Sequence, residues 1–147
     1  MTSGVINYLD GVSVHPYRGD LYPETAPYYT PTSTPNDRGY HWLDSLITLY
    51  EPAGKSIPIV CSEWGYSNSS LSIQTQADYL ARIQLFNLYD GIPLSIWYDW
   101  TGGNPSFNIV NSNLIPKLPY VTATTLTREL RGYQMRGRYD TGDSGSI

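Results

Sequence analysis

The sequence predicts an α/β fold in which three parallel strands alternate with three helices. Three apolar runs lack the polar alternation of a half-exposed strand and so predict buried strands, over about residues 11–15, 57–62 and 93–98. Segments with apolar residues at helical spacing lie between and after them, over about residues 38–51, 72–89 and 119–131. Strands that alternate with helices form right-handed crossover units, and such units make a parallel sheet.

Local signals support the boundaries of the strands. Pro16 ends the first run, because proline cannot donate to a ladder. The central run, Ile57 to Cys61, leads directly to an acid, Glu63, and Gly65 then allows the chain to turn away. The third run also ends in aromatic residues and an acid, Asp99.

The helices have similar signals. Leu43, Leu46, Ile47 and Tyr50 repeat at helical spacing in the first, and Pro52 follows them. An Asp-Gly pair ends the second and a proline begins the third. In the second helix we expect one inward face, made of Ala77, Leu80, Ala81, Gln84, Leu85 and Leu88.

Two segments have no predicted element. Residues 18–37 form a long loop rich in tyrosine and proline, whose role the sequence leaves open. Residues 134–147 have no apolar period, so we predict a flexible tail after a domain over residues 1–133.

Size and charge exclude some classes of partner. The 147 residues are enough for one domain with a core, and the net charge of −4 argues against a nucleic-acid partner. No run is long enough to span a membrane. Residues 1–9 lack the pattern of a signal peptide, and the localisation stays open, since the chain can be a piece of an exported enzyme.

Neither a metal nor another cofactor is expected. The two histidines, His15 and His41, have no paired spacing with cysteines or acids. Cys61, the one cysteine, lies in a buried strand, where we expect an inert thiol.

Aromatic residues are abundant and charged residues are scarce. The chain has 14 tyrosines and 4 tryptophans, whereas charged residues make up only 15%. Flat rings with a polar handle suit carbohydrates, which stack on rings and exchange hydrogen bonds through their hydroxyls. A tyrosine-rich core and surface without any ligand explains the same composition.

Glu63 is the candidate functional residue. A carboxylate at the carboxyl end of a buried parallel strand lies where α/β barrels keep their catalytic groups. Acids at strand ends also cap helices or pair with arginine, and spacing alone does not decide between these roles.

Three segments together resemble the end of a clan A glycoside hydrolase, nearest to cellulase-like and family 39-like (β/α)8 barrels. They correspond to the sixth, seventh and eighth strands of that barrel, and they are Asp10 to Tyr17, Ile57 to Tyr66 and Pro93 to Trp100. The segment from Asn113 to Leu130 is similar to the approach to the last helix of the barrel. The resemblance covers roughly residues 6–133, nearly the whole chain, and implies a partial TIM barrel.

The resemblance implies roles for four residues. Glu63 matches the nucleophile of a retaining glycosidase, and His15 and Tyr17 match strand-six residues that face the sugar. Trp97 matches the tryptophan on which the sugar stacks. The alternative for His15, Tyr17 and Trp97 is ordinary packing.

The sequence contains no counterpart of the second catalytic residue of the family, the general acid/base. In the family the general acid/base is a glutamate that follows an asparagine, and the chain has no Asn-Glu pair. Asp99 is another acid at a strand end, but the family does not use that position.

Three hypotheses follow. The chain is the nucleophile-bearing C-terminal half of a glycosidase, inactive without an N-terminal half-barrel, with an oligo- or polysaccharide as substrate. Alternatively, it is a non-catalytic carbohydrate-binding remnant. The third hypothesis is a truncated barrel fragment that forms a homo-oligomer through its open strand edges.

Overall fold

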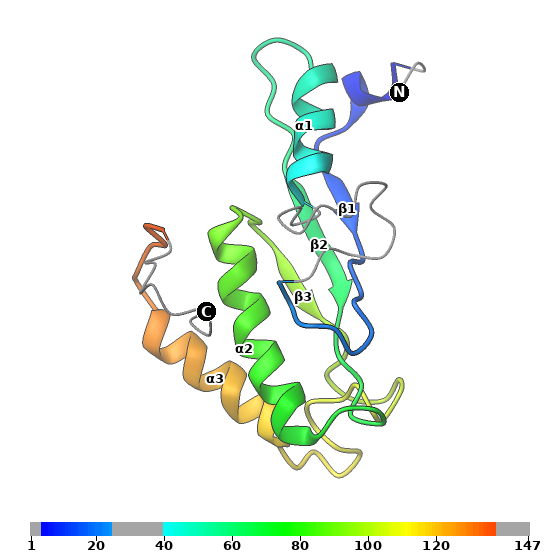
Figure 1. Cartoon of the computed structure of the whole chain (residues 1–147), viewed down its shortest axis with the longest axis vertical. Coiled ribbons are helices and arrows are strands. Elements are labelled where there is room, and N and C mark those ends of the chain that lie inside the picture. Colours follow the sequence, from blue (N-terminus) through cyan, green and yellow to red (C-terminus); the bar gives the residue numbers. More distant parts are fainter. Residues whose placement is uncertain (1–3, 25–39, 138–147) are drawn as a thin grey trace.

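The structure is a computed structural model that describes residues 4–24 and 40–137 (Figure 1). Three strands form a parallel sheet in the order β1-β2-β3. In chain order, the elements are the 3-10 helix η1 (Val5–Tyr8), β1 (Val12–Val14), α1 (Tyr40–Tyr50), β2 (Ile59–Trp64), α2 (Ile73–Tyr89), β3 (Ser95–Trp97) and α3 (Leu118–Leu130). The predicted α/β fold, with its alternating strands and helices, is therefore confirmed.

The central strand begins and ends two residues later than the sequence predicts. Pro58 has no N–H to donate, and its carbonyl accepts from the Val12 N–H at 2.8 Å before the ladder begins. At the other end the Tyr98 N–H donates to the Trp64 carbonyl at 2.7 Å, which extends the pairing beyond the polar residues. Glu63 is thus part of β2 instead of following it.

The outer strands are shorter than predicted, and the helices agree closely. Within the described residues the first and third strands have three residues each. Ser72 caps α2, since its side chain accepts from the Thr75 N–H at 2.9 Å. Residues 25–39 and 138–147, which hold most of the predicted long loop and tail, lie outside the described residues.

One face of the sheet packs against α1 and α2. Ile59, Cys61 and Trp64 of β2 are at most 5% exposed there, and Tyr40 and Ile47 of α1 pack against the same cluster. From α2 the cluster receives Tyr79, Ile83 and Phe86. A smaller cluster joins α2 and α3, and α3 contacts α2 along its length (Figure 1).

The buried face of α2 is wider than predicted and is turned toward the sheet. Its buried residues are Gln76, Ala77, Tyr79, Leu80, Ile83, Phe86 and Asn87. Leu88, a predicted inward residue, is 47% exposed. Of the six predicted inward residues only Ala77 and Leu80 are buried, because the predicted stripe was rotated about the helix axis and missed Tyr79, Ile83 and Phe86. The prediction also missed Gln76 and Asn87, because they are polar; Gln76 donates to the Tyr66 carbonyl at 2.6 Å, and Asn87 donates to Ser95 Oγ at 2.8 Å.

A membrane-spanning helix is absent from the described part of the chain. Within residues 4–24 and 40–137, no helix combines the length and the apolarity that a lipid bilayer requires of a spanning helix.

Candidate functional site

A β-bulge in β2 lets two neighbouring side chains point away from the helices. Cys61 pairs with Ser95 and Trp64 pairs with Trp97, so two residues of β2 lie opposite the single residue between them in β3. Cys61 and Trp64 are both fully buried on the helix side. Ser62 and Glu63, between them, contact residues that follow β1 or belong to it, on the opposite face of the sheet.

Glu63 has a phenol and an imidazole beside its carboxylate. Tyr17 donates a hydrogen bond to Glu63 Oε1 at 2.9 Å, and His15 Nδ1 lies 3.8 Å from the same oxygen. The Glu63 side chain is 40% exposed and that of His15 is 53% exposed. The carboxylate is therefore held in place and still open to a ligand from solvent.

Two serines fix the other side of the imidazole. His15 Nε2 lies 3.0 Å from Ser62 Oγ, which in turn lies 2.5 Å from Ser13 Oγ. This chain of polar contacts crosses from β1 to β2 and orients the His15 ring so that Nδ1 faces Glu63.

Tyr17 remains a hydrogen-bond donor over the physiological pH range. Its burial raises the pKa of the phenol well above the usual 10, and the hydrogen bond to Glu63 and the charge of that carboxylate raise the pKa further. The neutral phenol therefore keeps its proton available for the hydrogen bond to Glu63 Oε1.

Aromatic rings form one wall of the site. Phe107 contacts Tyr17 with its ring centroid at 6.1 Å and Tyr98 at 5.8 Å, both edge to face. The peptide bond between Tyr98 and Asp99 is cis. The sequence predicted the core or the rim of the barrel for Tyr98, at the end of the third apolar run, and gave no role to Phe107, because the loop that returns Phe107 has no regular pattern.

The close approach of this wall requires a glycine after β2. A Cβ atom on Gly65 would collide with the Tyr98 carbonyl oxygen and would lie 3.2 Å from Phe107 Cδ1. The glycine that sequence reasoning assigned to a turn therefore also makes room for the loop beside the site.

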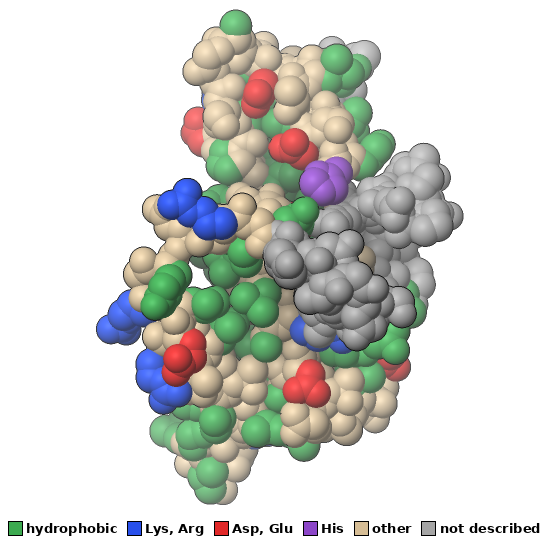
Figure 2. Space-filling model, turned by 60° about the vertical axis from the view of Figure 1, so that its left-hand side comes forward, with side chains coloured by type: hydrophobic (Ala, Val, Ile, Leu, Met, Phe, Trp, Pro, Cys, Tyr) green, Lys and Arg blue, Asp and Glu red, His purple; other side chains and the backbone are tan. Residues whose placement is uncertain are grey.

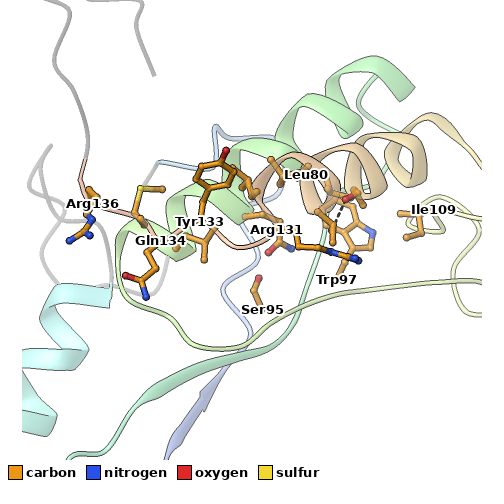
Figure 3. A pocket seen from close by; sticks show the side chains of 15 residues that line it. Leu80, Ser95, Trp97, Ile109, Arg131, Tyr133, Gln134 and Arg136 are labelled. Carbon is orange, nitrogen blue, oxygen red and sulfur yellow. Dashed lines mark hydrogen bonds between the residues drawn. The ribbon is translucent and has the colours of Figure 1, made fainter.

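Trp97 lies away from Glu63. It pairs with Trp64, and its ring lies 6.0 Å from that of Trp64 on the helix side of the sheet. Its indole N–H donates to the Phe107 carbonyl at 3.1 Å, and the ring lines a cavity between α2 and α3 (Figure 3). The structure thus brings His15 and Tyr17 to Glu63 but does not bring Trp97 there.

Asp99 is engaged in its own loop. Its carboxylate accepts from the Gly103 N–H at 3.0 Å. In the orientation that satisfies both ends of its amide, the buried Asn108 also donates to Asp99 and accepts from the Gly102 N–H. These contacts give Asp99 a structural role as the anchor of residues 99–109.

The segment that carries Tyr17 is tied to α2 and to the end of β2. The Tyr66 hydroxyl donates to the Leu21 carbonyl at 3.0 Å. Arg82 makes a bidentate ion pair with Glu24, with nitrogen to oxygen distances of 3.0 and 2.5 Å, and packs over the Tyr22 and Tyr79 rings. These anchors limit the freedom of the Tyr17 side chain.

The described part of the chain contains no set of side chains arranged as metal ligands. Its His, Cys, Asp and Glu side chains form no group of three or more that could hold an ion. Burial raises the pKa of Cys61 to about 11, so the thiol stays protonated at neutral pH.

Comparisons with known proteins identify a glycoside hydrolase-like fold. The sequence matches no family model and no curated protein. Among solved structures, the chain is similar to a family 39 glycoside hydrolase from the gut symbiont Bacteroides cellulosilyticus WH2, with 25% sequence identity and a TM-score of 0.78. The similarity covers 90% of this chain and 29% of that chain. The three parallel strands and their helices are thus consistent with part of a barrel.

Proposed function

We propose that the chain is the nucleophile-bearing part of a retaining glycoside hydrolase that cleaves O-glycosyl bonds in an oligo- or polysaccharide. The observation that carries this proposal is the Glu63 carboxylate, exposed near the carboxyl end of a parallel strand and hydrogen-bonded by Tyr17. The similarity to a family 39 glycoside hydrolase supports the same reaction class.

In this mechanism Glu63 attacks the anomeric carbon while the bond from that carbon to the leaving oxygen breaks. The Tyr17 hydrogen bond holds the carboxylate in its orientation before the attack. Water then hydrolyses the glycosyl-enzyme ester, and Glu63 leaves as a carboxylate. His15 Nδ1 lies 3.8 Å from the same oxygen, close enough to contact a sugar bound at Glu63.

The reaction also needs a carboxylic acid that protonates the leaving oxygen, at about 5–5.5 Å from the nucleophile. Among the described residues, the cluster around Glu63 contains no second acid, and Asp99 is held by its own loop. We therefore propose that another segment supplies the acid/base, either from a longer protein or from a second polypeptide. The chain spans less than a third of the length of the similar hydrolase.

The test combines an activity assay with a covalent trap. The chain is incubated with a panel of aryl glycosides, alone and with a co-expressed candidate N-terminal half-barrel. Activity that needs both polypeptides supports the proposal, whereas full activity of the chain alone refutes the need for a separate acid/base. Active-site labelling by a 2-fluoro glycoside, mapped by mass spectrometry, should modify Glu63.

Substitution of the proposed nucleophile gives the first prediction. Glu63→Gln keeps the shape of the side chain but cannot attack, so kcat of the chain complemented by its N-terminal half should fall at least about a thousandfold. The matched control is Glu129→Gln, at an exposed position of α3, which should keep full activity. Equal activity of the complemented Glu63→Gln variant and the complemented unaltered chain would remove Glu63 from the mechanism.

A second candidate function is binding of a carbohydrate without cleavage. Among the described residues, Glu63 is the one carboxylate of its cluster, and cleavage needs two. The Tyr17, Tyr98 and Phe107 rings beside it could still bind a sugar. Titration with oligosaccharides separates the two: a binding module keeps its affinity in Glu63→Gln and shows no turnover with any added half-barrel.

A further inference from the structure

Two strands carry a row of polar side chains on the face of the sheet opposite to α1 and α2. The valines of β1 pack against the helix-side core, and side chains alternate along a strand, so Ser13 and His15 point to the other face. β2 contributes Ser62 to that face, and the bulge adds Glu63 next to it. The contacts of these four side chains run from Ser13 through Ser62 and His15 to Glu63.

The backbone beyond β1 holds His15 in this row. The Tyr17 N–H donates to the His15 carbonyl at 2.9 Å, and the buried Arg18 donates from Nη1 to the Pro16 carbonyl at 2.9 Å. Pro16 also has a fixed φ angle. With the backbone constrained in this way, the neutral imidazole still has one choice, which is the ring nitrogen that carries its proton.

The carboxylate of Glu63 favours a proton on Nδ1 of His15. Glu63 Oε1 lies 3.8 Å from Nδ1, and a carboxylate that acts as a nucleophile accepts hydrogen bonds but donates none. A lone pair on Nδ1 would face this negative charge, whereas an N–H turns its positive end toward it. On the face of the molecule that Figure 2 shows, charged side chains are scattered among hydrophobic and neutral ones. Scattered charges at a distance are screened, so the nearest one decides.

Ser62 supplies the donor that this tautomer requires on the other side of the ring. With its proton on Nδ1, the imidazole of His15 has a lone pair on Nε2, and Ser62 Oγ lies 3.0 Å from that atom. The Ser13 hydroxyl lies 2.5 Å from Ser62 Oγ and can donate to it, which leaves the Ser62 proton for the ring. All the protons then point in one direction along the row, toward Glu63.

We propose that Ser62 is a positioning residue whose hydroxyl holds His15 in the tautomer that carries its proton on Nδ1. This rests on the proposed function, because the Nδ1–H is then the donor that meets a hydroxyl of a sugar bound at Glu63. The hydrogen bond at one ring nitrogen sets the protonation of the other. Without the Ser62 donor, the ring returns to the tautomer with its proton on Nε2, which predominates for free histidine in water, and presents a lone pair to the sugar.

Nitrogen-15 NMR of the whole chain reads the tautomer directly, without a sugar or a second polypeptide. The chain has two histidines, so labelling with nitrogen-15 histidine gives signals from two imidazoles, and His41→Gln assigns them. A protonated and an unprotonated ring nitrogen differ widely in chemical shift. At the alkaline end of a titration, where both rings have become neutral, we expect the proton of His15 on Nδ1. A proton on Nε2 would overturn the proposal.

Matched variants separate the Ser62 hydroxyl from the rest of the row. Ser62→Ala should make the Nε2-protonated tautomer of His15 the major form, whereas Ser62→Thr, which keeps a hydroxyl, should leave the proton on Nδ1. Ser13→Ala should also leave it there, because Ser62 keeps its proton for the ring. His41, whose Nε2 lies 3.8 Å from Asp90, is the internal reference and should not change. An Nδ1 proton that persists in Ser62→Ala, or is lost in Ser13→Ala, would contradict the assignment.

Steady-state kinetics of the complemented enzyme tests the consequence for the sugar. Ser62→Ala should raise KM about tenfold with little change in kcat, because the hydrogen bond from His15 is made to the bound sugar before and during the reaction. Ser62→Thr should restore KM, and an unchanged KM in Ser62→Ala would count against the proposal. The NMR measurement needs no reaction, so its failure leaves the covalent labelling of Glu63 as a separate result.

Discussion

At the scale of single residues, the sequence located the acid but not all of its neighbours. An apolar run that leads into Ser62, Glu63 and Trp64 was sufficient to single out the carboxylate, and the structure places His15 and Tyr17 beside it. Ser13 and Ser62 have no such signal, because a serine in a strand is equally common on a solvated face. Trp97 was assigned to the wrong face, since the bulge and the pairing with Trp64 are not visible in the sequence.

The hydrogen bond between Tyr17 and Glu63 gives a prediction at this scale. Tyr17→Phe keeps the ring against Phe107 but removes the donor to the carboxylate. A hydrogen bond to a charged group contributes about 1.5–3 kcal/mol, so kcat/KM of the complemented enzyme should fall at least about tenfold. The measurement is steady-state kinetics on an aryl glycoside.

A suitable control for Tyr17→Phe changes a phenol that is far from the site. Tyr8 is 84% exposed, and Tyr8→Phe should leave kcat/KM unchanged. If both variants keep full activity, the Tyr17 hydroxyl has no role in the function of Glu63.

At the scale of elements, prediction succeeded where the periodicity was local. Apolar spacing and the Asp-Gly pair at its end were enough to predict α2, and Pro119 marked the start of α3. Prediction was less accurate where tertiary contacts decide the outcome. The end of β2 depends on a hydrogen bond from Tyr98, and the buried face of α2 depends on Gln76 and Asn87 finding polar partners.

The contact between the end of β2 and the loop after β3 gives a prediction at the element scale. Gly65→Ala would push a methyl group into the Tyr98 carbonyl and against Phe107. Overpacking of this kind costs about 1–3 kcal/mol of the free energy of unfolding, because the loop must move. Urea denaturation followed by circular dichroism measures the loss.

The matched control is Gly11→Ala. A Cβ atom at Gly11 would lie 3.4 Å from the Pro58 carbonyl oxygen, an ordinary contact, so the urea midpoint should change little. Equal destabilisation by both variants would contradict the specific conflict at Gly65.

At the scale of the whole molecule, the buried phenols predict a loss of stability in alkali. Burial raises the pKa of Tyr40 and of Tyr66 well above the usual 10, and raises the pKa of Cys61 to about 11. Above about pH 9 the unfolded chain releases these protons while the folded chain retains them. The unfolded state then binds fewer protons, so the free energy of unfolding falls as the pH rises.

Urea midpoints measured between about pH 8 and pH 11 test this prediction. Tyr40→Phe removes one buried phenol and should make the decline less steep, whereas Tyr8→Phe, at an exposed position, should not. A midpoint that stays constant over this range would show that the phenols do not contribute.

The alternation of strands and helices is enough to predict the fold class of the whole molecule, because that order permits few topologies. The open edge of β3 was foreseen in general terms, since three strands cannot close on themselves. The cavity between α2 and α3 was not foreseen, because Ile109, Ala123 and Trp97 come together there only through tertiary contacts.

The β-bulge in β2 has a consequence for variants in which one residue of this strand is deleted. Deleting Ser62 would restore a regular ladder, with Cys61 and Trp64 still buried and Glu63 alone between them. We expect the deletion variant to have a free energy of unfolding close to that of the intact chain, since no core residue changes face. Its His15 ring would lose the contact with Ser62, so catalysis should suffer although the scaffold survives. Insertions and deletions at this one position would therefore separate a requirement of the reaction from a requirement of folding.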